Sequence, residues 1–151
     1  MSTITPEGII SNLARALDFS TRTPILRRPA EYGMAYEGVR FPAADGTTLE
    51  GWFIPADSDK LVIANHPMPA NRYPGHLPEF SNPSVDFEVN FLPDYKNLHD
   101  AGYNVLAYDL RNHGRSDAAS VGVCGLGWLE YRDVIGSLRY GRERLGIASP
   151  A

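Results

Sequence analysis

Two short apolar runs without polar alternation stand out along the chain, and a polar loop follows each of them. One run lies within residues 61–65 and precedes His66, and the other lies within residues 103–109 and ends at Asp109. Runs of this kind are typical of strands buried on both faces of a parallel sheet, and such sheets place their sites where the strands end. The pattern therefore predicts two buried parallel strands, each followed in the sequence by a functional loop.

The remaining periodic segments predict a hairpin and three helices. Residues 36–41 and 49–54 are strand-like and flank the turn sequence at residues 44–47, which favours a β-hairpin. Helical spacing or helix-end signals occur at residues 5–17, at residues 92–101 before Gly102, and at residues 128–145. In the last of these, the positions expected to pack on the sheet are Trp128, Tyr131, Val134, Ile135, Leu138 and Leu145.

The order of these elements predicts the fold class and the domains. A strand, a crossover helix and a second strand require a parallel pair. We therefore expect an α/β fold, with a three-layer, mostly parallel sheet and an N-terminal antiparallel hairpin. Residues 1–30 form an N-terminal helix and connector in this interpretation, and residues 31–151 form the main domain. Residues 67–90 are rich in proline and unusually long for a connection, which predicts a surface loop that shapes a site.

Composition narrows the class of protein. The 151 residues are 43% hydrophobic and 21% charged, which is typical of one globular domain. The net charge of −4 offers no basic surface for nucleic acid. Cys124 is the single cysteine, so an intrachain disulfide is excluded and no zinc-ligand spacing exists. No secretion signal or membrane-length apolar stretch is recognisable. We expect a cytoplasmic protein with no metal, no cofactor and no membrane partner.

Two residues could be taken for nucleophiles. Ser116 lies in a sequence close to G-x-S-x-G, and Cys124 lies between glycines in residues 122–127. A nucleophile of this type sits on a sharp turn directly between a strand and a helix, and neither residue has that context. We interpret Ser116 as a structural loop residue and Cys124 as a packed side chain. A nucleotide site at residues 122–127 stays open as an alternative, because the segment is rich in glycine. It is the weaker alternative, because its glycine spacing differs from that of the dinucleotide fingerprint.

Several motifs in this order resemble the α/β-hydrolase superfamily, in particular its esterase-like members. The motifs are Asp-Gly-Thr-Thr-Leu-Glu-Gly-Trp at residues 45–52, the strand ending in His66, Asp-Ala-Gly-Tyr at residues 100–103, and Asp-Leu-Arg-Asn-His-Gly-Arg-Ser at residues 109–116. The resemblance covers roughly residues 38–145. It implies an incomplete α/β-hydrolase fold, with the nucleophile, the acid and the base expected beyond Ala151 and no catalytic residue within the chain.

The resemblance also implies roles for two loops. His66, Pro67 and Met68 take the place of the oxyanion loop and line the substrate pocket, with the Met68 amide as the matching donor. Pro67 stands where the family usually has glycine and has no N–H of its own. Asp109 and His113 are expected to brace the loop that follows the fourth strand, since aspartate commonly accepts backbone N–H bonds in turns.

The function implied is hydrolysis of a small ester or a related carbonyl compound by the complete protein. The chain alone is expected to be inactive. Its partner would be the missing C-terminal half, or a second copy bound through the open sheet edge. A non-catalytic binding or assembly module with an α/β half-sheet is the alternative.

Overall fold

A computed structural model describes residue 7 and residues 22–67, 70–75 and 88–146. Within them the elements are η1 (Pro29–Tyr32), β1 (Glu37–Pro42), β2 (Thr48–Ile54), β3 (Leu61–Ala64), α2 (Leu92–Asp100), β4 (Asn104–Tyr108), η3 (Ser120–Gly122) and α3 (Tyr131–Arg144). The strands and helices predicted in these residues all form. Apart from residue 7, the helix predicted at residues 5–17 lies outside the described residues.

The four strands form one mixed sheet in the order β1-β2-β4-β3. The β1–β2 and β2–β4 pairs are antiparallel, and only β3 and β4 are parallel. The prediction of a mostly parallel sheet is therefore wrong for the described residues. The hairpin explains the difference, because it places β2 between β1 and β4 and antiparallel to both. Any further parallel strand would have to pair with the free edge of β3, and no described strand pairs there.

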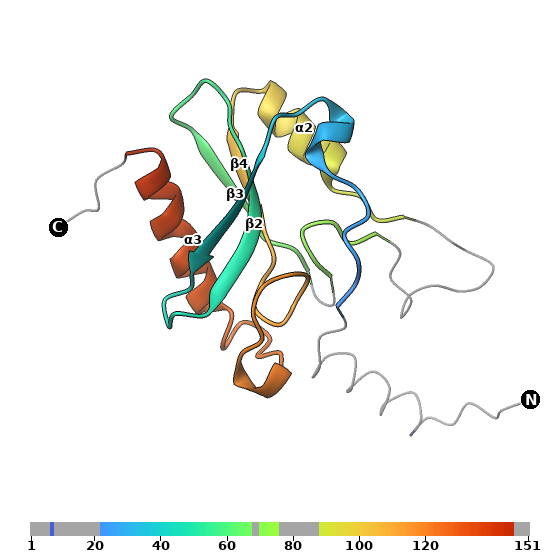
Figure 1. Ribbon diagram of the computed structural model, residues 1–151, viewed down its shortest axis with the longest axis vertical. Helices are drawn as coiled ribbons and strands as arrows, with labels where there is room; N and C mark the ends of the chain where they lie inside the picture. Colours follow the sequence, from blue (N-terminus) through green and yellow to red (C-terminus); the bar gives the residue numbers. More distant parts are fainter. Residues whose placement is uncertain (1–6, 8–21, 68–69, 76–87, 147–151) are drawn as a thin grey trace, which may run out of the picture.

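Each face of the sheet packs against one helix, as Figure 1 shows. Neighbouring residues on a strand point to opposite faces, so Trp52 and Phe53 belong to different clusters. The first cluster holds Trp52, Ile54, Val105 and Ala107 against Leu92 and Tyr95 of α2. The second holds Phe41, Leu49, Phe53, Leu106 and Tyr108, with Tyr140 of α3 packed on them. The buried runs expected of β3 and β4 thus differ: β4 is fully buried, whereas β3 is half-buried.

Helix α3 contacts the sheet through small and polar residues. Its buried residues are Asp133, Gly136, Ser137 and Gly141. A Cβ atom on Gly136 would lie 2.4 Å from the Pro42 carbonyl oxygen, so the helix packs too closely for a larger side chain. Trp128, Tyr131 and Leu138 are 82%, 50% and 46% exposed. The prediction that these three pack on the sheet is therefore wrong.

Residues 70–75 of the long proline-rich segment are also buried. Asn71 and Tyr73 are nearly inaccessible to solvent, and the Asn71 side-chain amide donates to the Thr23 carbonyl at 2.9 Å. Residue 75 pairs with residue 89 in an isolated antiparallel bridge. The expected surface loop is thus wrong for residues 70–75, because their polar groups find partners inside the protein.

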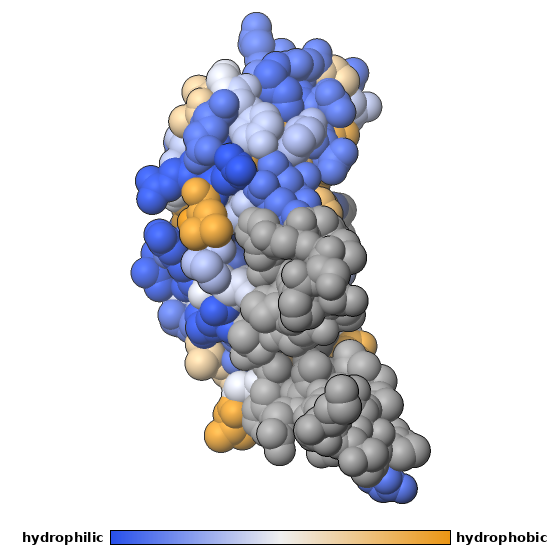
Figure 2. Space-filling view, turned by 90° about the vertical axis from the view of Figure 1, so that its right-hand side faces the viewer, coloured by the Kyte–Doolittle hydropathy of each residue, from blue (hydrophilic) through white to orange (hydrophobic). Residues whose placement is uncertain are grey.

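The outer surface is mostly polar where it can be seen. On the face drawn in Figure 2, the described residues are largely hydrophilic, with hydrophobic residues in separate small groups. No helix in the described part of the chain is long and apolar enough to cross a membrane.

Candidate functional site

His66 links the ends of the two parallel strands. It follows β3 and is 5% exposed, and its Nε2 accepts the N–H of Leu110 at 3.0 Å. The other ring nitrogen, Nδ1, donates to the Pro67 carbonyl at 3.0 Å. This pair of bonds requires a neutral ring, and burial lowers the pKa of His66 to about 4. His66 therefore orients the loop after β3. Met68, the expected oxyanion donor, lies outside the described residues.

His113 lies beside His66, with the two ring centres 5.1 Å apart. It is fully buried, and Nδ1 donates to the Arg111 carbonyl at 2.8 Å. Its Nε2 faces the Cys124 sulfur at 3.9 Å. Burial lowers the pKa of His113, which favours a neutral ring beside the thiol. Cys124 is 5% exposed and follows no strand, so the geometry supports a packed side chain.

Asp109 connects three segments from the end of β4. Its carboxylate accepts the N–H of Arg72 at 2.9 Å and the N–H of Arg115 at 2.8 Å. The Arg72 Nη1 lies 3.2 Å from Oδ2 of the same group. Asp109 is fully buried, and burial raises its pKa, although the contacts with Arg72 oppose that change. A Cβ atom on Gly114 would lie 2.1 Å from Oδ2, so the loop needs glycine there.

Ser116 is held by hydrogen bonds within this loop. Its hydroxyl donates to the Asp109 carbonyl at 2.6 Å and accepts the N–H of Glu50 at 2.9 Å. The side chain is 1% exposed. A hydroxyl that is bound on both sides and away from solvent cannot reach a substrate, which supports the structural interpretation of Ser116.

Arg111 forms a second buried polar centre that sequence patterns did not reveal. The side chain is 1% exposed, and its Nε and Nη2 donate to Asp133 Oδ1 at 2.9 and 2.8 Å. Its other contacts reach Asp45 at 2.9 and 3.1 Å, and these bonds lower the pKa of Asp45 to about 2. Arg111 thereby joins the β1–β2 turn, the loop after β4 and helix α3. No local pattern shows that these residues meet, because they are far apart in sequence.

The glycine-rich segment before α3 is occupied by a carboxylate of the chain itself. Glu130 accepts the N–H groups of Gly125 at 2.8 Å and Gly127 at 2.7 Å. Although burial opposes the change, these backbone bonds lower the pKa of Glu130. The segment follows no strand, and two of its amides are already used, which disfavours a nucleotide phosphate there. Within the described residues, no three His, Cys, Asp or Glu side chains are grouped to hold a metal ion.

Solved structures similar to this one include an esterase. The esterase Pf2001 of Pyrococcus furiosus matches with a TM-score of 0.68 and 26% identity, over 84% of this chain and 42% of that one. A second crystal form of it gives a TM-score of 0.65 and 25% identity. DcsB, solved in complex with its substrate analogue, matches with a TM-score of 0.54 and 18% identity over 72% of this chain.

The chain resembles the N-terminal part of α/β hydrolases, which confirms the resemblance seen in the sequence. It spans about 42% of the length of the Pyrococcus esterase. No protein-family model matches the sequence, and no curated protein matches it.

Proposed function

We propose that the main domain is the N-terminal part of a serine hydrolase that cleaves an ester or a related carbonyl compound. The observation that supports this most is the likeness to an esterase over 84% of the chain. The proposal assigns the nucleophile, the acid and the base to a segment beyond Ala151. It assigns to His66, Pro67 and Met68 the oxyanion loop, with the Met68 N–H as donor.

The sheet offers a place for that segment. Helix α3 follows β4 along the chain. It packs against β3, since Gly141 lies close to Leu61. A right-handed crossover through α3 would place a following parallel strand next to β3. Its carboxyl end would then lie beside the loop that starts at His66. A nucleophile at that strand end would thus come close to the proposed oxyanion donor.

The described residues offer no convincing nucleophile of their own. Ser116 is bound on both sides, and the Cys124 thiol is buried beside a neutral His113. We therefore expect the purified chain to show no turnover of p-nitrophenyl acetate and no labelling by a fluorophosphonate probe. Saturable hydrolysis that disappears in Ser116→Ala or Cys124→Ala would contradict the proposal.

The positive test uses the DNA downstream of the codon for Ala151. It should encode a strand followed by G-x-S-x-G, and later an aspartate and a histidine. In the longer protein, Met68→Pro removes the proposed donor N–H and should lower kcat by about 10²- to 10³-fold. Met68→Leu keeps the N–H and is the matched control. If both variants are equally active, the oxyanion assignment is wrong.

The same DNA also decides between this proposal and the assembly-module alternative. If the downstream DNA encodes no such segment, a binding or assembly module becomes the better proposal. That alternative predicts a discrete folded oligomer of the purified chain at micromolar concentration, which sedimentation velocity would detect.

A further inference from the structure

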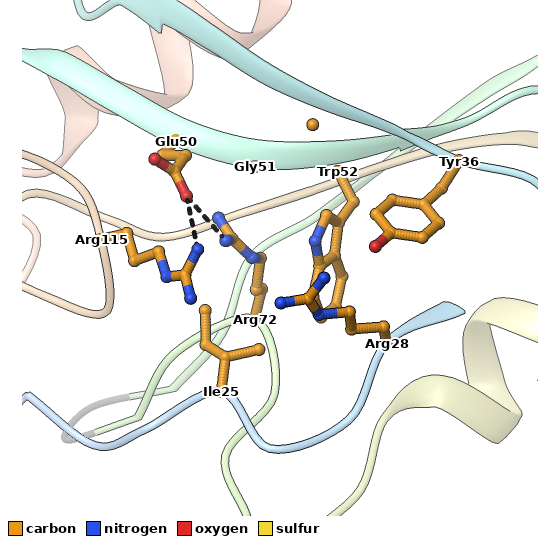
Figure 3. Close-up of a pocket in the computed structure, with 9 residues that line it drawn as sticks. Ile25, Arg28, Tyr36, Glu50, Gly51, Trp52, Arg72 and Arg115 are labelled. Carbon is orange, nitrogen blue, oxygen red and sulfur yellow. Dashed lines mark hydrogen bonds and ion pairs between the residues drawn. The ribbon is translucent and has the colours of Figure 1, made fainter. Parts of the chain in front are cut away.

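A pocket of about 200 Å³ lies between residues 25–28, strand β2 and the loop after β4. Figure 3 shows three guanidinium groups around it, with Arg28 and Arg115 on opposite sides of Arg72. The carboxylate of Glu50 and the rings of Trp52 and Tyr36 complete the lining. The proposed hydrolysis does not use this pocket.

Arg72 forms the buried wall of the pocket, and its Nε has no acceptor among the described residues. The side chain is 3% exposed, and its Nη2 donates to Glu50 at 3.1 Å. The guanidinium stacks over the Trp52 ring at 4.7 Å. Nε and Nη1 are buried and donate no hydrogen bond to any described residue. Nη1 still forms an ion pair with Asp109 Oδ2 at 3.2 Å, so Nε is the buried nitrogen without an acceptor among the described residues, although buried donors are nearly always paired.

The charges around the pocket do not balance. Three guanidinium groups, of Arg28, Arg72 and Arg115, line the pocket with the single carboxylate of Glu50. Asp109 pairs with Arg72 from behind, which leaves one positive charge in excess. Within the described part of the chain, the Arg28 side chain forms no ion pair. The Arg115 Nη1 lies 3.9 Å from Glu50, and its side chain is 59% exposed. Two exposed guanidinium groups are therefore free to turn toward a single negative charge.

The uncharged lining limits the size and character of a ligand. Trp52, Tyr36 and Ile25 provide ring and aliphatic surface beside the guanidinium groups. A volume of about 200 Å³ corresponds to roughly seven waters at about 30 Å³ each. A small molecule with one negative charge and an apolar body fits both the charge and the walls. A planar carboxylate also suits the fork of donors that a guanidinium presents.

We propose that this pocket binds a small organic monocarboxylate with an apolar body. Arg28 and Arg115 contact the carboxylate directly, and Arg72 contributes its charge from behind. The Trp52 side of the pocket receives the apolar part. The proposal concerns the described residues of this chain and does not depend on the proposed hydrolase function.

The test is an NMR titration of the ¹⁵N-labelled chain with benzoate at low salt. The chain has two tryptophans, and Trp128→Phe assigns the indole N–H signal of Trp52. We expect a saturable shift of that signal at millimolar benzoate. Benzamide has the same shape without the charge, and it should bind at least about tenfold more weakly, because it loses the charge-assisted bonds.

Variants then locate the binding. Arg28→Gln combined with Arg115→Gln should weaken benzoate binding at least about tenfold, while both residues are exposed enough to leave the fold intact. Arg139→Gln removes one positive charge from an exposed position on α3 and should change the affinity less than about twofold. The proposal is overturned if benzoate gives no saturable shift, if benzamide binds equally well, or if Arg139→Gln weakens binding as much as the double variant.

Discussion

The two sides of helix α3 have opposite character. The side that meets the sheet and the loop after β4 carries Asp133 and Ser137, both fully buried. The side that faces solvent carries Tyr131 and Leu138, and the exposed Trp128 lies just before the helix begins. Most helices in globular proteins place their apolar residues toward the core. Here the polar side is inside because Arg111 requires the Asp133 carboxylate, and because close packing admits only small residues.

This contrast indicates how the described half of the fold is held together. A buried ionic network fixes the loop after β4, and the cost of an unpaired charge makes that arrangement specific. The outer stripe, defined here as Trp128, Tyr131 and Leu138, contributes little burial within the described residues. Exposed apolar side chains in one stripe are typical of a surface that another element covers. The outer stripe is therefore consistent with the proposed continuation of the fold beyond Ala151.

The largest expected effect comes from breaking the inner network at Asp133. Asp133→Asn removes the charge opposite a fully buried Arg111 and should lower the free energy of unfolding by about 3–5 kcal/mol. Asp45→Asn is the matched control, because that partner is 35% exposed and should cost about 1 kcal/mol or less. Urea denaturation at pH 7 measures both. Equal losses would show that burial does not set the strength of these pairs.

The next largest effect is a dependence of stability on pH that arises from His66, which follows β3. Because burial lowers the pKa of His66 from 6.5 to about 4, the unfolded chain binds a proton between those values and the folded chain does not. Stability is thus full above pH 6.5 and falls by about 3 kcal/mol as the pH drops to 4. His66→Gln should reduce this slope in denaturation measured at several pH values, and the part that stays belongs to His113, whose pKa burial also lowers.

A smaller effect is expected from Gly114, which lies against Asp109. Gly114→Ala places a Cβ atom against the carboxylate at a backbone φ of +46°. Gly102→Ala has the same conformational problem at φ +82° but meets no atom within 4 Å. We expect Gly114→Ala to cost about 2 kcal/mol more than Gly102→Ala in thermal unfolding. Equal costs would mean that the loop moves away from Asp109 freely.

The smallest effect is expected on the outer stripe. Trp128→Ser and Leu138→Lys should change the free energy of unfolding by less than about 0.5 kcal/mol. Self-association of the chain in sedimentation velocity should decrease with the same changes, since they remove exposed apolar surface. Tyr140→Ser is the contrast, because Tyr140 stacks on Phe41 at 4.8 Å and should cost stability. A large loss of stability from Trp128→Ser would show that the outer stripe is already buried against another part of the chain.

Local patterns predicted the elements better than their packing. The hairpin, both buried runs and the helix before Gly102 follow from turn residues, alternation and helix-end signals, which act within a few positions. The direction in which α3 turns its apolar residues was predicted wrongly. Hydrophobic spacing identifies a stripe, and it does not say whether the sheet or another element covers that stripe.

The candidate site shows the same division. The sequence places His66, Asp109 and His113 at or after the ends of the third and fourth strands, and they are found after β3 and β4. It did not reveal Arg72 or the Arg111–Asp133 pair, because these contacts join segments separated by tens of residues. The prediction of a surface loop failed at residues 70–75 for the same reason, since their polar groups find partners on distant segments.

The sequence by itself determined the order and type of the elements and the resemblance to one half of a hydrolase, because short-range backbone preferences and loop motifs are written locally. The tertiary structure alone decided which charges are buried together, which side of α3 faces inward, and where three arginines meet around one pocket. Those features depend on distances between remote segments, and electrostatic and packing energies are set by such distances rather than by position along the chain.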